Sequence, residues 1–144
     1  MSTNTENELG RLILKLANTI IKNRNRHLEA LELTTGQADS LQFFLSHGSA
    51  TITELKEHLG ITHQTACGIV QRMAAKGLVE MHRSIIDARC QIVEATTAGQ
   101  ALGYKMVANR ERTGSLLLRG MSTTERDTFI RLLTLALSNV SADC

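Results

Sequence analysis

Residues 51–99 decide the fold and read TITELKEHLGITHQTACGIVQRMAAKGLVEMHRSIIDARCQIVEATTAG. The first pattern opens at Thr51, which has Glu54 three residues later, the spacing of a capping box at a helix start. Apolar residues then recur at helical spacing until Gly60, which supplies the backbone conformation that ends a helix. A second helical pattern follows, with Thr62 as its N-cap. The stretch therefore begins with two short helices joined by a tight turn.

The second of these helices has an apolar face and a polar face. Between Ala66 and Met73 the apolar residues fall at i, i+3, i+4 and i+7, which is the pattern of a stripe packed against a core. The opposite face carries short polar side chains and almost no acid. Such a face suits the DNA major groove, where Gln reads adenine, Thr meets a base edge and Arg binds guanine or phosphate. The residues that we predict to contact DNA from this helix are Thr62, His63, Gln64, Thr65, Gly68, Gln71 and Arg72.

A strand, turn and strand pattern follows the second helix. Lys76 and Gly77 close the helix with a cation in its last turn and a glycine after it. Residues 78–82 and 90–95 then read as two strands around a turn at residues 83–89. This order predicts a helix-turn-helix with a β-wing. The predicted fold class is mainly α with a small β-wing, flanked by N- and C-terminal dimerisation helices.

The motifs of this stretch resemble those of the MarR family of bacterial winged helix-turn-helix regulators. The matching runs are Lys76-Gly77-Leu78-Val79, Asp87-Ala88-Arg89 in the wing, and Thr96-Thr97-Ala98-Gly99, which is similar to the family's Leu-Thr-x-x-Gly motif with Ala95 in place of Leu. The resemblance covers nearly the whole chain. It implies a homodimer that represses transcription from a near-palindromic DNA operator. It also implies relief of repression by a small molecule, phenolic or otherwise amphipathic, bound between the DNA-binding domain and the dimerisation helices.

The turn of the wing departs from the family pattern. The turn carries Ser84-Ile85-Ile86 and Ala88 where family members tend to be polar or basic, so contact with the DNA minor groove rests on Arg83 and Arg89. Asp87 is expected to support the wing by orienting Arg89 through an ion pair, without touching DNA.

Two observations leave another function class open. Residues 51–94 contain five Lys or Arg against five Asp or Glu, a weak electrostatic footprint for a DNA-binding protein. An exposed Ile85-Ile86 pair at the wing turn also suits a protein partner. The alternative is therefore a winged-helix protein-interaction module that does not read DNA. A steep loss of duplex affinity with added salt would favour the interpretation of the chain as a DNA-binding protein.

Long helical patterns flank the central stretch. After a polar segment at residues 1–7 that we expect to fray, an apolar helical period runs from Glu8 to about Leu31. Two further helical patterns follow Thr97, separated at Gly120. Such long apolar helices require a partner surface, and the family resemblance implies a second copy of the chain. The predicted organisation is an N-terminal dimerisation helix in residues 1–33, a winged helix-turn-helix domain in 34–97 and C-terminal dimerisation helices in 98–144.

Composition places the chain among ordinary globular domains. It has 144 residues, 42% of them hydrophobic, with a net charge of +2 and no apolar run that approaches a membrane span. The terminal residues lack a secretory pattern, so we expect a cytoplasmic protein with no membrane partner.

Chemical motifs are few. The cysteines Cys67, Cys90 and Cys144 show no Cys-x-x-Cys spacing, and their odd number argues against a disulfide framework. Cys67 flanks the outer face of the second helix, so a cysteine-based redox-sensing regulator is a further alternative. No spacing among the five histidines matches a metal site. No nucleophile elbow or phosphate loop is present, and we predict neither enzyme activity nor a cofactor.

Overall fold

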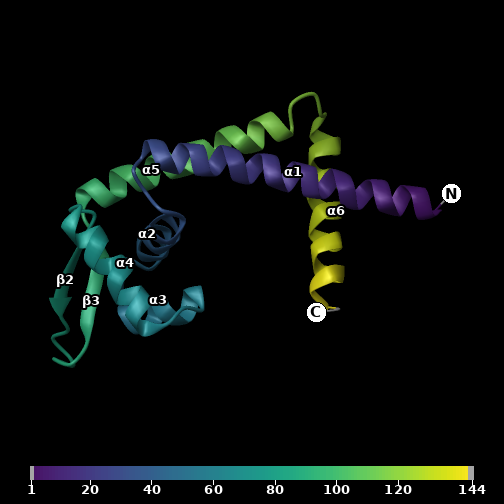
Figure 1. The fold of residues 1–144 in the computed structure, drawn as a ribbon. Helices are drawn as coiled ribbons and strands as arrows, with labels where there is room; N and C mark the ends of the chain where they lie inside the picture. The colour runs from purple at the N-terminus through teal and green to yellow at the C-terminus, as the bar shows by residue number, and fades with distance from the viewer. Residues whose placement is uncertain (1, 143–144) are drawn as a thin grey trace. The chain divides into compact units, whose positions relative to one another are not determined.

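The structure is a computed structural model that describes residues 2–142. The described residues form helices and one small three-stranded antiparallel sheet (Figure 1), which confirms the predicted fold class of a mainly α protein with a β-wing. The elements are α1 (Ser2–Ala30), α2 (Thr35–His47), β1 (Ser49–Thr51), α3 (Ile52–Leu59), α4 (His63–Ala75), β2 (Val79–Arg83), β3 (Gln91–Ala95), α5 (Thr97–Leu117) and α6 (Thr123–Ala142).

Two compact units divide the chain, one up to Asn109 and one from Arg110 onward. The helix-turn-helix and the sheet lie wholly within the first unit. The end of α5 and all of α6 belong to the second. The assignment of roles to residues 1–33, 34–97 and 98–144 stays a prediction.

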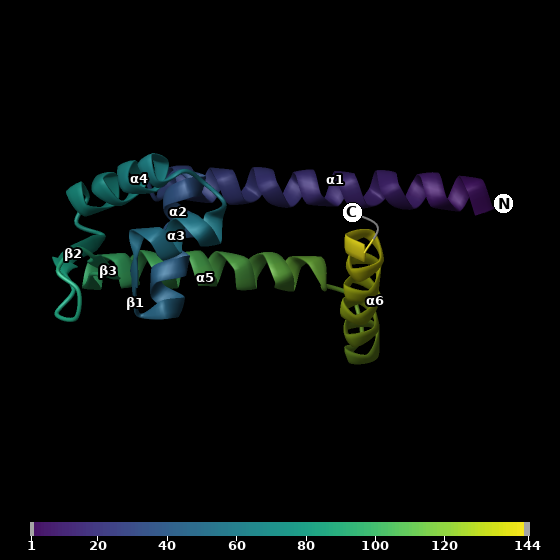
Figure 2. The same ribbon diagram turned by 90° about the horizontal axis from the view of Figure 1, so that it is seen from below.

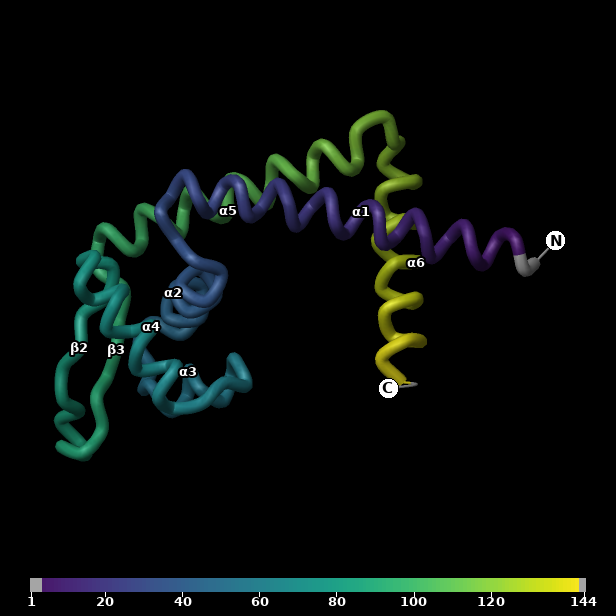
Figure 3. Tube along the Cα trace, viewed as in Figure 1, coloured from purple at the N-terminus to yellow at the C-terminus, as the bar shows by residue number. Residues whose placement is uncertain are grey.

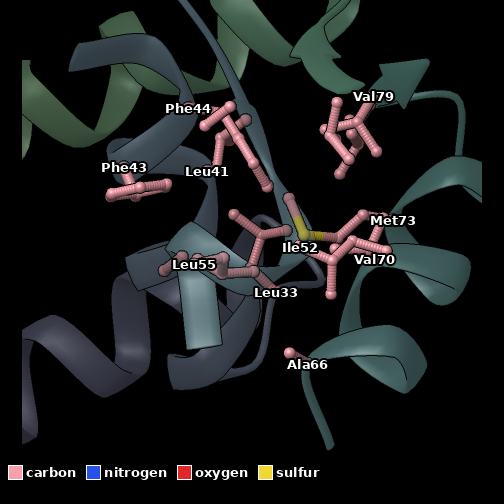
Figure 4. Close-up of a cluster of buried hydrophobic side chains, with 14 of the residues drawn as sticks. Leu33, Leu41, Phe43, Phe44, Ile52, Leu55, Ala66, Val70, Met73 and Val79 are labelled. Carbon is pink, nitrogen blue, oxygen red and sulfur yellow. The ribbon is translucent and has the colours of Figure 1, made fainter. Parts of the chain in front are cut away.

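The core of the first unit lies between α2, α3, α4 and the sheet (Figure 4). On α4, the predicted inward residues Ala66, Val70 and Met73 are fully buried, and Ile69 is partly buried. Each large apolar side chain contributes roughly 1.5–3 kcal/mol when it is fully buried. This packing fixes the rotation of α4 and turns its other face to solvent. The largest fully buried apolar side chains are Phe44, Leu41, Leu55, Met73, Val70 and Val93.

Capping boxes start α2 and α3 as the sequence predicts. The Thr51 hydroxyl accepts a hydrogen bond from the Glu54 backbone N–H at 3.1 Å, and the Glu54 carboxylate accepts from the Thr51 N–H at 3.2 Å. Thr34 and Gln37 make the same reciprocal pair at the start of α2. At the end of α3, Gly60 has φ 65°, the left-handed conformation that glycine adopts without strain.

Strand β1 is a feature that the sequence analysis missed. Its three residues pair antiparallel with β3, Ala50 opposite Val93, so β3 is the central strand of the order β1-β3-β2. A strand of three residues is too short to show an alternating pattern. The β2–β3 hairpin confirms the prediction to within one residue at each strand. Because β1 runs directly into α3, the wing is joined through β3 to the start of the helix-turn-helix.

Helix α1 begins earlier than predicted. The expectation that residues 1–7 fray is wrong for the described part, because the helix starts at Ser2. Residues 2–7 contain neither Gly nor Pro, and extending an existing helix requires no new nucleation. Near its other end, Arg24 contacts the Asp39 carboxylate at 2.7 Å and links α1 to α2. Both side chains are about 40% exposed, so this pair contributes at most about 1 kcal/mol.

The start of α5 rests on the backbone at Leu78. The Thr96 N–H donates to the Leu78 carbonyl at 3.0 Å, and the Thr96 hydroxyl donates to the Gly77 carbonyl at 2.6 Å while it accepts from the Gly99 N–H at 3.1 Å. A Cβ placed on Gly99 would overlap the Leu78 carbonyl oxygen. The Thr-x-x-Gly motif therefore has a physical reason here: Thr caps the helix, and Gly leaves room for the neighbouring backbone.

In the second unit, a capping box starts α6 as predicted. The Ser122 N–H donates to the Glu125 carboxylate at 2.9 Å, and the Ser122 hydroxyl accepts from the Glu125 N–H at 3.1 Å. These hydrogen bonds lower the pKa of Glu125 below its ordinary value of 4.5. The charged box is thus fully formed above that pH and weakens as the pH falls through the lowered pKa. None of the helices in residues 2–142 has the length and apolar character needed to cross a membrane.

Candidate nucleic-acid interface

Helix α4 turns its predicted DNA-reading face to solvent. Its polar side chains are exposed, and Gly68 lies half-buried among them. This face forms a shallow depression of about 530 Å³ on the outside of the helix. The lining residues are Gln64, Thr65, Cys67, Gly68, Gln71 and Arg72, which include no acid. Five residues predicted to contact DNA therefore form one continuous surface.

Thr62 organises the start of α4. Its hydroxyl accepts a hydrogen bond from the Thr65 N–H at 3.1 Å and donates to the Thr65 hydroxyl at 2.8 Å. The Thr65 hydroxyl thus keeps its own proton for another acceptor. The N-terminus of a helix carries partial positive charge and unpaired N–H groups, which attract phosphate. His63 lies exposed in this first turn, where it can meet the same phosphate.

Gly68 is not required by the packing of the free chain. A Cβ at this position would meet only the Arg72 guanidinium, at 3.8 Å, which is ordinary van der Waals contact. Glycine in a helix interior costs roughly 1 kcal/mol relative to alanine. The residue thus weakens α4 and leaves its outer surface flat at the centre of the reading face.

The wing turn is held by its own hydrogen bonds. The Ser84 N–H donates to the Cys90 carbonyl at 2.9 Å, and the Cys90 N–H donates to the Asp87 carbonyl at 3.0 Å. Inside the turn, the Ser84 hydroxyl accepts from the N–H groups of Ile86 and Asp87 at 3.2 and 3.3 Å. Figure 3 shows this turn at the end of the hairpin remote from α5. The turn therefore has a defined shape before any partner binds.

Asp87 contacts Arg89 as the sequence analysis expected. Its carboxylate accepts from the Arg89 backbone N–H at 3.0 Å and lies 3.4 Å from the Arg89 Nε. The Arg89 side chain is nevertheless 92% exposed. A pair this exposed adds little stability, and it leaves the terminal guanidinium nitrogens available to a partner.

A hollow of about 550 Å³ lies between the start of α4 and the wing. Arg83 and Arg89 line it from the wing, and His63 lines it from α4. The structure thus brings together three residues that the sequence placed in separate elements. Sequence reasoning did not assign three other polar residues of the same lining to the site, Thr51 at the end of β1, Thr53 on α3 and Gln91 on β3. Gln91 pairs with Arg83 in the hairpin register, a placement that requires the strand pairing to be known.

No acidic residue is among the described residues that line the hollow. Glu80 and Glu94 are opposite each other in the β2–β3 register, near the end of the hairpin that leads into α5. Glu54 is held in its capping box, and Asp87 faces Arg89. The balanced charge count therefore hides the local arrangement, in which Arg83 and Arg89 line the hollow and Asp87 in the same turn does not.

Lys76 anchors the far end of α4. Its ammonium group donates to the Glu32 backbone carbonyl and, at 3.0 Å, to the buried Gln37 side chain. Glu32 has φ 58° and lies between α1 and α2. One lysine therefore links α4, the helix predicted to contact DNA, to the junction of α1 with α2. Figure 2 shows this side of the first unit, with α4 above α2.

The cysteines divide by burial. Cys67 is half-buried and packs against the core, whereas Cys90 is exposed, and both line the hollow beside the wing. Cys144 lies outside the described residues. A redox role for Cys67 stays a prediction. Within residues 2–142, no three His, Cys, Asp or Glu side chains are grouped as a metal site.

A helix-turn-helix whose second helix contacts a β-hairpin defines a winged helix protein. The sequence model of the MarR family matches residues 31–89 of the chain. The chain is also similar to the HTH-type transcriptional repressor NicR of Pseudomonas putida, with 30% identity over 102 residues. That alignment covers 71% of this chain and 65% of NicR, so the matched region spans slightly less than two thirds of the relative.

Solved structures share the fold. A MarR family protein from Bacillus stearothermophilus is 23% identical with a TM-score of 0.82, over 98% of this chain and 99% of that one. A mutant MarR from E. coli complexed with operator DNA is 26% identical with a TM-score of 0.67, over 93% and 96%. Together with the sequence matches, these similarities support a MarR family protein, in agreement with the resemblance drawn from its motifs.

Proposed function

We propose that this chain is a DNA-binding transcriptional regulator, a dimeric repressor of a near-palindromic operator. The observation that carries the proposal is the exposed, acid-free face of α4 beside a hollow lined by two wing arginines. Gln64, Thr65 and Gln71 supply sequence preference in the major groove, and Arg72 adds a guanine or phosphate contact. NicR is named as a transcriptional repressor, and a mutant MarR has been crystallised with operator DNA.

A second copy of the chain is the proposed partner of the long helices. Helix α6 has no buried residue in the single chain, and α1 is also largely exposed along its apolar side. Apolar surface of this extent marks an interaction site. A two-fold dimer would present two copies of α4 to half-sites related by the same symmetry. The most exposed apolar side chains of these two helices are Leu9, Leu12, Leu14, Ile21, Ile130, Leu135, Leu137 and Val140.

A small-molecule effector, phenolic or otherwise amphipathic, is proposed to relieve repression. The Lys76 link supports this part of the proposal, because a shift at the α1–α2 junction would act directly on the end of α4. A coupling of roughly 1–3 kcal/mol between effector and operator is typical of allosteric proteins.

The test is binding of the purified protein to the DNA upstream of its own gene, against a scrambled duplex, at two salt concentrations. We expect preference for the native duplex and a steep loss of affinity at the higher salt. Sedimentation of the complex should give two chains per operator. Equal binding to both duplexes, or none to either at low salt, would reject the regulator reading in favour of a protein-interaction module.

Gly68→Ala is expected to change stability and DNA affinity in opposite directions. The added methyl group meets only ordinary contacts in the free chain, so α4 should gain about 0.5–1 kcal/mol. On DNA the same methyl group would stand between the helix backbone and the base edges, and we expect affinity to fall at least about tenfold. Urea unfolding and duplex titration measure the two effects. A variant that is more stable and binds as tightly as the native chain would show that DNA does not approach α4 at this point.

A further inference from the structure

Two isoleucines project from the wing turn. Ile85 and Ile86 are 103% and 98% exposed, so neither side chain packs against the rest of the chain. The hydrogen bonds of Ser84 hold the backbone that carries them. Because both side chains are β-branched, they also have few rotamers to lose. The turn is thus a small, preshaped apolar projection, and the proposed function assigns it no role.

Cations flank the projection on both sides. Arg83 ends β2, and Arg89 follows the turn with its guanidinium exposed. Asp87 follows Ile86 directly and pairs with Arg89, whereas the other acidic residues of the hairpin, Glu80 and Glu94, lie near its opposite end. An apolar tip between two arginines matches a surface that has negative charge at its edges and an apolar interior. A DNA minor groove has this character, with phosphates along both rims and stacked bases between them.

The position of the hairpin relative to α4 favours the same partner. The wing contacts α4 and shares a hollow with the start of that helix. With α4 in a major groove, an arm on the far side of the phosphate backbone meets the next minor groove, because the two grooves alternate along the duplex.

We propose that Ile85 and Ile86 act as an apolar wedge that enters the minor groove and partly unstacks one base step. This inference rests on the proposed DNA-binding function and adds a deformation of the DNA to it. Proteins that insert Ile, Leu or Phe in this way kink the duplex by roughly 20–90° toward the major groove. Pyrimidine–purine steps unstack most easily. We therefore expect a TA or CA step under each wing, and specificity at a position where no hydrogen bond reads a base.

The experiment uses a duplex selected from a random-sequence library for tight binding to the native protein. Dyes at its two ends report bending by energy transfer, and 2-aminopurine placed at successive adenines reports unstacking. The test variant is Ile85→Ser with Ile86→Ser, and the matched control is Ile85→Leu with Ile86→Leu, which keeps the apolar volume. Thermal unfolding should be the same for all three proteins, because the side chains are fully exposed.

The native protein and the leucine control should bend the duplex and raise 2-aminopurine fluorescence at one step in each half-site. The serine variant should lose both signals, while its affinity falls only about three- to tenfold, because unstacking offsets most of the gain from burial. If the serine variant bends and unstacks the duplex as the native protein does, the proposal of a wedge is wrong, and the exposed isoleucines would instead favour contact with a protein partner. If the native protein selects no duplex, the proposed function itself fails, and the wedge fails with it.

Discussion

Replacing both wing arginines, Arg83→Ala with Arg89→Ala, is expected to lower affinity for every duplex by roughly 100-fold at physiological salt. A hydrogen bond to a charged group contributes about 1.5–3 kcal/mol, so each lost phosphate contact accounts for about tenfold or more. The two guanidinium groups line one hollow, and the Arg89 side chain is 92% exposed, so neither supports the core. Folding should be unaffected.

Salt dependence separates this effect from lost base recognition. Each phosphate contact contributes about one unit to the slope of log affinity against log salt, and the double variant should lose about two units. Its preference for the native over the scrambled duplex should remain. The matched control is Lys22→Ala with Arg26→Ala, which removes the same charge from the exposed part of α1. A comparable loss in the control would mean that net charge, and not the wing, determines affinity.

Gly99→Ala is expected to have the largest effect on stability, about 3 kcal/mol at fixed protein concentration. The new methyl group would overlap the Leu78 carbonyl oxygen and approach Leu41, which is fully buried. Backbone cannot move aside without breaking the hydrogen bond from Thr96 to Leu78, so the start of α5 must shift. Overpacking of a filled site typically costs 1–3 kcal/mol, and a clash with backbone falls at the upper end.

Gly103→Ala is the matched comparison, because it lies one turn further along α5. There the new methyl group would meet the end of the Leu45 side chain, which can change rotamer. We expect its cost to be less than half that of Gly99→Ala. Urea unfolding midpoints measure both. Equal costs at the two positions would show that general crowding along α5, and not the Leu78 carbonyl, explains the glycine at position 99.

Local chemistry could be read from the sequence, and pairing across the chain could not. The capping boxes at Thr34, Thr51 and Ser122 depend on residues three apart, so a short window contains the whole motif. The buried face of α4 can likewise be read from the sequence of the helix alone, because its apolar residues recur with the helical period. Strand β1 depends on a partner more than forty positions away, Val93 opposite Ala50, and its three residues carry no pattern of their own.

The candidate site shows the same division. The polar face of α4 and the two wing arginines follow from sequence pattern, but the hollow that joins them to His63 depends on how the hairpin packs beside the helix. The balanced charge of residues 51–94 argued against DNA. A count of charged residues does not show where the charges lie. The strand register places Glu80 opposite Glu94 and leaves Arg83 next to the turn.

The unbroken pairing of β2 with β3 also makes the wing a part that can be lengthened by design. Every residue from Val79 opposite Ala95 to Arg83 opposite Gln91 is in register, without a bulge. Adding one residue to each strand would move the side chains beyond it to the other face of the hairpin. Adding two to each would preserve the faces and move the turn outward by about 7 Å. The distance between the reading helix and the wing tip could thus be adjusted in fixed increments to engineer regulators for operators with a different groove spacing.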